Sequence, residues 1–244
     1  MSPIQRRDHL LIACALLLVV AVGAFALAPR SHAAALPAGV AEQRFTAHGS
    51  AGASPVTAIS VSLGDSRYRV QPMLTHGKLL SQLNVVAVID GDFYNLQTGR
   101  PSGRFVIDGA ASGAIAEPSL VLSPGPVAIT RYARAIDTSV ISGKPRLLVD
   151  GDTATTYEAD GATSDQIDAV VPRSAVALDA GRLYLVACGE PGLTMAEWAT
   201  TLQARGYTDA LNLDGGPSTG LVAEHQLVIG QDAKVPTALV IVRR

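Results

Sequence analysis

The chain has 244 residues, of which 48% are hydrophobic and only 16% are charged, whereas charged residues make up about 25% of a typical soluble domain. Its formal net charge is −2 and it has no basic run, which argues against a nucleic-acid partner. The two cysteines, Cys14 and Cys188, lack the number and spacing of a disulfide scaffold or a zinc finger.

The first segment has the composition of an export signal. Arg6 and Arg7 precede an uncharged apolar run over residues 10–28, and Ala33–Ala35 forms an Ala-x-Ala cleavage motif. This order predicts a signal peptide over residues 1–35, with an uncleaved N-terminal anchor as the alternative because the run approaches the length of a membrane span. We therefore expect a protein exported to the periplasm or secreted, which contacts the membrane only through this segment. The remaining residues carry a formal charge of −4 and one cysteine.

Short apolar runs separated by turn residues fill most of the rest. Residues 36–54 are rich in Ala and Gly, which predicts a linker, and the domain itself is expected over residues 55–244. Turn residues 64–66 and 179–181 each predict a hairpin between the strands beside them. Strands are predicted at Val56–Leu63, Arg67–Leu74, Val85–Ile89, Arg104–Ile107, Ser119–Leu122, Val127–Thr130, Pro145–Val149, Ser174–Leu178, Arg182–Cys188, Leu211–Leu213, Leu221–Ala223, Leu227–Ile229 and Pro236–Val242.

Helix signals are few. Leu193–Arg205 has a capping box made by Thr194 and Glu197, and Gly206 follows its end. A shorter helix is predicted over residues 76–84. Many strands and about two helices predict an α+β fold, a β-rich mixed-sheet domain, and exclude the regular alternation of a Rossmann fold.

Asp-Gly directly follows Ile, Val or Leu four times, at Asp90, Asp108, Asp150 and Asp214. For Asp108 and Asp150 we expect ordinary hairpin turns. Asp90 continues into Gly91-Asp92, which places two carboxylates at i and i+2 on one side of an extended segment. Asn212 and Asp214 have the same spacing and precede Gly215. Polar groups that follow buried strands beside glycines are typical of binding sites.

Two carboxylates with separated pKa values can act as the acid and the base of a glycosidase. The Asp90 and Asp92 pair could instead bind a divalent cation, since hard cations prefer carboxylate oxygens; otherwise no metal or other cofactor is expected. Arg173 and Arg104 are candidates for holding an anionic substrate, because a guanidinium matches phosphate geometry. Surface salt bridges are the alternative for both arginines.

Two nucleophile motifs do not fit. Gly216–Gly220 matches the Gly-x-Ser-x-Gly pattern around Ser218, but a hairpin-like run rather than a helix follows it, and the later His225 and Asp232 come in the wrong order. Cys188 ends an apolar strand, where buried thiols are usually inert.

Several blocks in order resemble the phosphodiester glycosidase family over about residues 79–242. They are Val88–Tyr94, Pro101–Gly103, Val171–Ala177, Gly192–Thr194 and Ala210–Ser218, of which Asn212–Gly216 is the most specific. The resemblance implies an α+β domain that hydrolyses the glycosidic bond of a sugar linked through phosphate, so that a carbohydrate or glycan phosphodiester is the expected partner.

The resemblance also implies roles for individual residues. Arg173 would hold the phosphate, Asp214 would be one of the acid/base pair, and Asp90 or Asp92 would be the second carboxylate. Asn212 and Ser218 would position sugar hydroxyls, beside Gly215 and Gly216 of the intact block.

Two blocks depart from the family pattern. Asp90 stands where the family usually has Asn, and Cys188-Gly189-Glu190 stands where it usually has Asp-Gly-Arg. Replacing a guanidinium by the Glu190 carboxylate should weaken phosphodiester binding through like-charge repulsion. Three explanations stay open: a different substrate, substitution by Arg104 or Arg100, or a catalytically silent glycan-binding module of the same fold.

Overall fold

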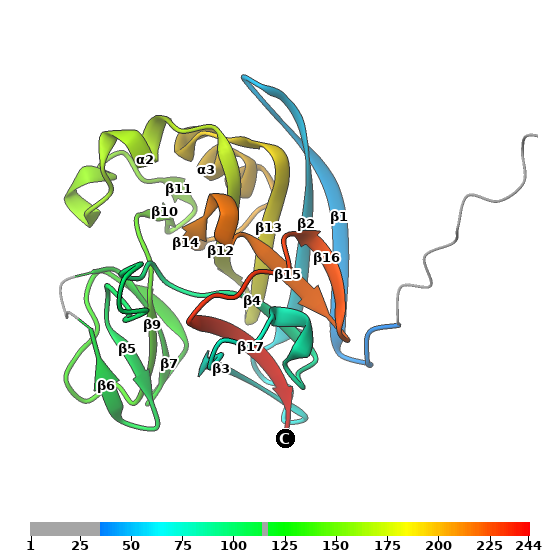
Figure 1. Ribbon diagram of the computed structural model, residues 1–244, viewed down its shortest axis with the longest axis vertical. Helices are drawn as coiled ribbons and strands as arrows, with labels where there is room; N and C mark the ends of the chain where they lie inside the picture. The colour runs from blue at the N-terminus through cyan, green and yellow to red at the C-terminus, as the bar shows by residue number, and fades with distance from the viewer. Residues whose placement is uncertain (1–34, 114–116) are drawn as a thin grey trace, which may run out of the picture. The chain divides into compact units, whose positions relative to one another are not determined.

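The computed structural model describes residues 35–113 and 117–244, which contain three β-sheets and two α-helices (Figure 1). This confirms the strand-rich α+β class. The predicted export signal lies outside the described residues, apart from its last position. Within the described part of the chain, no helix is long and apolar enough to cross a membrane.

The seven-stranded sheet has the order β1-β2-β13-β12-β14-β10-β11. Its strands are β1 (Val40–Gly49), β2 (Gly52–Ser62), β13 (Arg182–Leu193), β12 (Val171–Asp179), β14 (Asp209–Gly215), β10 (Arg146–Val149) and β11 (Asp152–Thr153).

Two five-stranded sheets accompany it, in the orders β16-β15-β4-β17-β3 and β6-β5-β9-β7-β8. The first contains β16 (Gln226–Gly230), β15 (Gly220–Ala223), β4 (Ala87–Asp90), β17 (Thr237–Arg243) and β3 (Tyr68–Leu74). The second contains β6 (Ala110–Ser112), β5 (Phe105–Ile107), β9 (Ser139–Ser142), β7 (Ser119–Ser123) and β8 (Ala128–Thr130). Every pair of neighbouring strands in these sheets is antiparallel, so no sheet is mixed.

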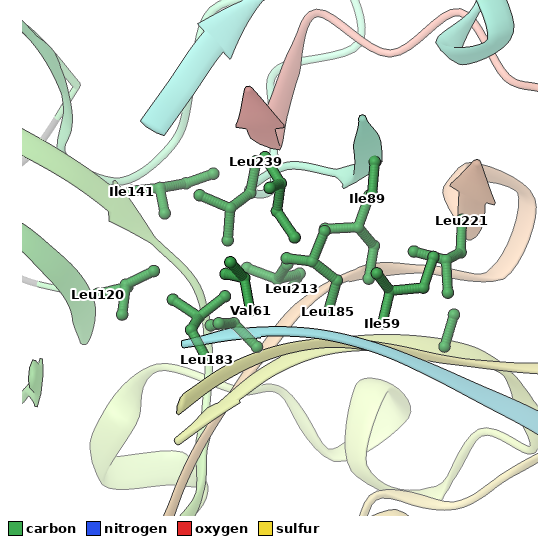
Figure 2. Packing of buried hydrophobic residues seen from close by; sticks show 14 of the residues in the cluster. Ile59, Val61, Ile89, Leu120, Ile141, Leu183, Leu185, Leu213, Leu221 and Leu239 are labelled. Carbon is green, nitrogen blue, oxygen red and sulfur yellow. The ribbon is translucent and has the colours of Figure 1, made fainter. Parts of the chain in front are cut away.

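The main core lies between the seven-stranded sheet and the other two sheets (Figure 2). Ile59, Leu183 and Leu185 point from the large sheet toward side chains of the smaller sheets, among them Ile89, Leu221 and Leu239 of one and Leu120 and Ile141 of the other. All of these side chains are fully buried. Because side chains alternate along a strand, the same strands present a second apolar face on the opposite side.

That second face is covered by the helix α3 (Met195–Ala204), whose Trp198 and Leu202 are fully buried there. Its capping box is present as predicted, with Thr194 accepting from the Glu197 backbone N–H and Glu197 accepting from the Thr194 N–H. The short helix α2 (Ser164–Asp168), which the sequence pattern did not indicate, precedes β12. Three short 3₁₀ turns complete the fold: Leu80–Gln82, Glu158–Asp160 and Gly216–Ser218.

The prediction of a linker over residues 36–54 is wrong. Residues 40–49 form β1, which pairs with β2 over ten positions from Val40↔Val61 to Gly49↔Gly52. The abundance of Ala and Gly concealed the strand, although Ala47 is buried in the core beneath α3.

Two local predictions around residues 64–84 are also corrected. β2 and β3 do not form a hairpin, because β1 and β13 already occupy both edges of β2, and β3 pairs with β17 instead. The helix expected over residues 76–84 is reduced to the 3₁₀ turn Leu80–Gln82. By contrast, Asp108 and Asp150 form tight turns with positive φ, as predicted.

Leu185→Ala tests the main core. It should lower the free energy of unfolding by about 2–5 kcal/mol, because the side chain is fully buried between the sheets. The control Leu96→Ala, at a side chain that is 87% exposed, should change it by less than about 0.5 kcal/mol. Urea denaturation measures both, and equal losses would contradict this core.

Candidate functional site

The chain places two carboxylates where the buried strand β4 ends. The Val88-Ile89 run is fully buried, so β4 lies inside its sheet, paired with β15 and β17. Asp90 is the last residue of β4. Gly91 passes so close to β17 that a Cβ atom there would lie 2.6 Å from the backbone carbon of Thr237.

The Asp90 carboxyl group is fully buried and connects two sheets. Its Oδ1 accepts hydrogen bonds from Ser174 Oγ of β12, at 2.5 Å, and from the Gly220 N–H of β15, at 3.0 Å. Its Oδ2 is buried with no hydrogen-bond partner among the described residues. Burial raises the pKa of Asp90 well above its usual value, despite these two donors.

Asp92 is 1% exposed and lies against β17. Its Oδ1 accepts from Thr237 Oγ1 at 3.3 Å, and its Oδ2 has no partner within the described part of the chain. Burial is the main cause that raises the pKa of Asp92 well above the usual value, and the nearby charges of Glu117 and Asp214 add to it. A carboxyl group in this environment keeps its proton to a higher pH than an exposed one.

Asp214 differs from the other two aspartates because its side chain is partly exposed. Its backbone N–H donates to the Gly91 carbonyl at 3.0 Å, which joins β14 to the segment that follows β4. Burial raises its pKa, while hydrogen bonds from Ser218 and from the Gly215 N–H oppose the shift. Its charge contributes to the raised pKa of both Asp90 and Asp92, so the three predicted carboxylates lie together.

Two glycines follow Asp214 directly. Gly216 has a left-handed φ of +59°, and a Cβ atom there would meet nothing within 4 Å. It begins the 3₁₀ turn Gly216–Ser218, which brings Ser218 back to the Asp214 carboxylate. Gly215, Gly216 and Ser218 therefore lie beside the one aspartate that solvent reaches.

Arg173 is not brought to the aspartates. It neighbours Ser174 on β12, and since Ser174 points to Asp90, Arg173 points to the opposite face of the sheet. Its Nε and Nη2 donate to three backbone carbonyls, those of Leu193, Gln166 and Ala169. The side chain thus holds α2 against the end of β13, and burial lowers its pKa.

Cys188 pairs with Arg173 across β12 and β13, and its Sγ accepts the Arg173 backbone N–H at 3.2 Å. Burial raises the pKa of this thiol to about 12, so it is neutral at physiological pH and unsuited to nucleophilic attack. Glu190, two residues further along β13, is exposed. Arg104 is partly buried, and its Nε has no hydrogen-bond partner among the described residues.

Two charged residues that the sequence pattern did not indicate lie beside the aspartates. Lys144 and Glu117 form an ion pair at 2.8 Å, and the Lys144 ammonium lies 5.6 Å from the centre of the Phe93 ring. Asn212 is buried and donates from Nδ2 to the Lys144 carbonyl at 2.8 Å. No sequence signal identifies this pair, because only the fold brings residues 117 and 144 next to Asp92.

A metal site of three or more ligands is not found among the described residues: no group of His, Cys, Asp and Glu side chains there is arranged to hold one. The oxygens of Asp90 and Asp92 that do have partners are bound by hydrogen-bond donors of the protein.

Comparisons with known proteins give a family and a fold. The family model described as phosphodiester glycosidase matches residues 83–242. A solved protein from Synechocystis superposes with a TM-score of 0.69 at 17% identity, covering 84% of this chain but only 62% of its own. A search of the curated proteins finds no match.

Two further solved structures share the fold. One is the catalytic domain of zebrafish N-acetylglucosamine-1-phosphodiester alpha-N-acetylglucosaminidase, auto-inhibited by its pro-peptide, with a TM-score of 0.69, 18% identity and coverage of 87% of this chain and 86% of that one. The other is a protein from Burkholderia pseudomallei, with a TM-score of 0.58, 13% identity and coverage of 78% and 74%.

Asp90→Asn tests the buried carboxyl. Because folding raises the pKa of Asp90, the folded state keeps a proton that the unfolded state loses, and stability falls as the pH rises above about 4. Asp90 can lower the free energy of unfolding by at most about 1.4 kcal/mol for each pH unit of this rise. The Asn variant keeps the acceptor for Ser174 and Gly220 but lacks this pH dependence.

Urea denaturation between pH 5 and pH 8 measures the difference. Relative to the wild type, Asp90→Asn should become steadily more stable as the pH rises. Parallel pH dependences of the two proteins would contradict a protonated Asp90 in the folded state.

Proposed function

The chain belongs to the phosphodiester glycosidase family, and from this premise we propose that it is an exported hydrolase that cleaves the glycosidic bond of a sugar phosphodiester. The observation that carries the proposal is the cluster of Asp90, Asp92 and Asp214, in which two carboxyls are buried and one is partly exposed. Products of this cleavage are a free sugar and a phosphomonoester.

The different environments of the carboxyls suggest their roles. Asp92 is buried and its pKa is raised well above the usual value. It is therefore suited to act as the general acid that protonates the leaving phosphate oxygen. Asp214 is partly exposed, and although burial raises its pKa, hydrogen bonds from Ser218 and from the Gly215 N–H oppose the shift and favour the anionic form. We therefore assign Asp214 to the attack on the anomeric carbon, as nucleophile or as the base that activates water.

The remaining polar groups support this assignment. Asn212 and Ser218 flank Asp214 on β14 and on the turn that follows it, where Ser218 could position a sugar hydroxyl. Asp90 joins β12 to β15 through its hydrogen bonds with Ser174 and Gly220. Arg173 binds backbone carbonyls of α2 and β13 on the opposite face of the sheet. We therefore assign it a structural role rather than the binding of phosphate.

A catalytically silent glycan-binding module is the second candidate. The neutral thiol of Cys188 beside Arg173 and the exposed carboxylate of Glu190 favour it, because the family usually has an acid and a guanidinium at these positions. The double variant Cys188→Asp with Glu190→Arg separates the two functions. Activity that appears only in this variant supports the binding module, whereas activity already present in the wild type supports the hydrolase.

Asp214→Asn tests the catalytic assignment. The amide keeps the size of the side chain but cannot act as a base or a nucleophile, so hydrolysis of a sugar-1-phosphodiester should slow by about 10²–10⁴-fold. Release of the free sugar measures the rate. The matched control is Asp150→Asn, because Asp150 lies in a hairpin turn with φ of +52° that Asn also adopts readily.

The control should retain the wild-type rate. If Asp214→Asn is as fast as the wild type, the assignment of Asp214 fails.

Repeating the wild-type assay with EDTA tests the divalent-cation alternative. Loss of activity that added Mg²⁺ restores would support that alternative.

A further inference from the structure

We propose that Lys144 binds the phosphate group of the substrate, and that this phosphate replaces the Glu117 carboxylate as the partner of the Lys144 ammonium. The proposal rests on the proposed function for the presence of a phosphate in the substrate. The proposal assigns the phosphate, which is expected at Arg173 from the sequence, to Lys144 in the loop between β9 and β10.

The first observation is the placement of Lys144. Its ammonium is paired with Glu117 Oε1 at 2.8 Å, and each of the two side chains is 17% exposed. The Phe93 ring lies beneath the ammonium at 5.6 Å, and Phe93 directly follows Asp92. A cation over an aromatic face and beside one carboxylate is held in place before any ligand arrives.

The second observation connects Lys144 to the catalytic carboxyls. The Lys144 carbonyl accepts from Asn212 Nδ2, and Asn212 precedes Asp214 by two residues on β14. Gly143 packs so closely on the Asn212 carbonyl that a Cβ atom there would clash with it. The charge of Glu117, in turn, acts on Asp92. Lys144 is therefore joined to β14 through Asn212, and its ion-pair partner Glu117 lies close enough to Asp92 to raise the pKa of that carboxyl.

The third observation is that the ion pair is incomplete. Glu117 Oε2 is buried and has no hydrogen-bond partner among the described residues, and the same holds for Asn212 Oδ1 and Asp92 Oδ2. A buried carboxylate oxygen without a donor is unfavourable. A phosphate that takes the ammonium from Glu117 would let this side chain turn toward solvent, which relieves that cost.

An anion is the ligand that fits this site. Burial raises the pKa of Asp90 and of Asp92 well above the usual value, which favours the neutral form of each carboxyl and so reduces its repulsion of a phosphate. Arg173 donates to backbone carbonyls on the other face of the sheet. Lys144, by contrast, is paired with a single carboxylate oxygen rather than with backbone carbonyls, so a phosphate can compete for its ammonium.

The experiment measures binding separately from turnover. Inorganic phosphate is titrated into the full-length wild type and into Lys144→Met, Lys144→Arg and Glu117→Gln, with binding followed by calorimetry or by ¹H–¹⁵N NMR shifts. Lys144→Met should weaken phosphate binding at least about tenfold, as expected for loss of a charge-assisted contact, and Lys144→Arg should restore most of it. Glu117→Gln should bind more tightly than the wild type.

The matched control is Lys234→Met, at an exposed lysine on another part of the chain, which should bind phosphate as the wild type does. Thermal denaturation verifies that each variant is folded. Glu117→Gln should also shift the alkaline limb of the kcat/KM profile to lower pH, because removing its charge lowers the pKa of Asp92.

The outcomes separate this proposal from the proposed function. Phosphate binding that depends on Lys144 supports it even if no phosphodiester is hydrolysed. Equal binding by the wild type and Lys144→Met, or no binding by any variant, overturns it. Hydrolysis with a KM that Lys144→Met leaves unchanged also overturns it, while the hydrolase assignment stands.

Discussion

Packing of the seven-stranded sheet against the two smaller sheets determines where the polar groups of this protein meet. The interface is apolar along Ile59, Leu185 and Leu213, so these strands must lie with a fixed set of side chains inward. That constraint brings the end of β4 to the end of β14, where the Asp214 N–H donates to the Gly91 carbonyl. The carboxyls lie at the margin of the apolar layer, and their raised pKa values follow from it.

The sequence predicts the members of this cluster better than their surroundings. Asp90 follows the continuous apolar run 85–89, and Asp214 follows the alternating segment 210–213; a strand inside a sheet delivers the next residue to its edge. The capping box at Thr194 is equally local and is confirmed. These features depend on residues a few positions apart, so they can be predicted from the local sequence.

Features that depend on pairing between distant segments could not be predicted in this way. The turn at residues 64–66 resembles a hairpin turn, but only the neighbours of β2 reveal that both of its edges are occupied. The alternation along β12 sends Ser174 and Arg173 to opposite faces, and the face that holds the site becomes known only when β4 is placed. Lys144 and Glu117 are 27 residues apart, and their pairing requires the tertiary fold.

The close packing at Gly91 and Gly143 limits how the specificity of this site can be changed. A side chain at either position would collide with the backbone of Thr237 or of Asn212, so the floor beneath the carboxyls cannot be reshaped by ordinary substitution. Directed evolution toward another sugar would have to work at partly exposed side chains such as Phe93 or Ser218. Libraries that leave Gly91 and Gly143 unchanged avoid these two collisions.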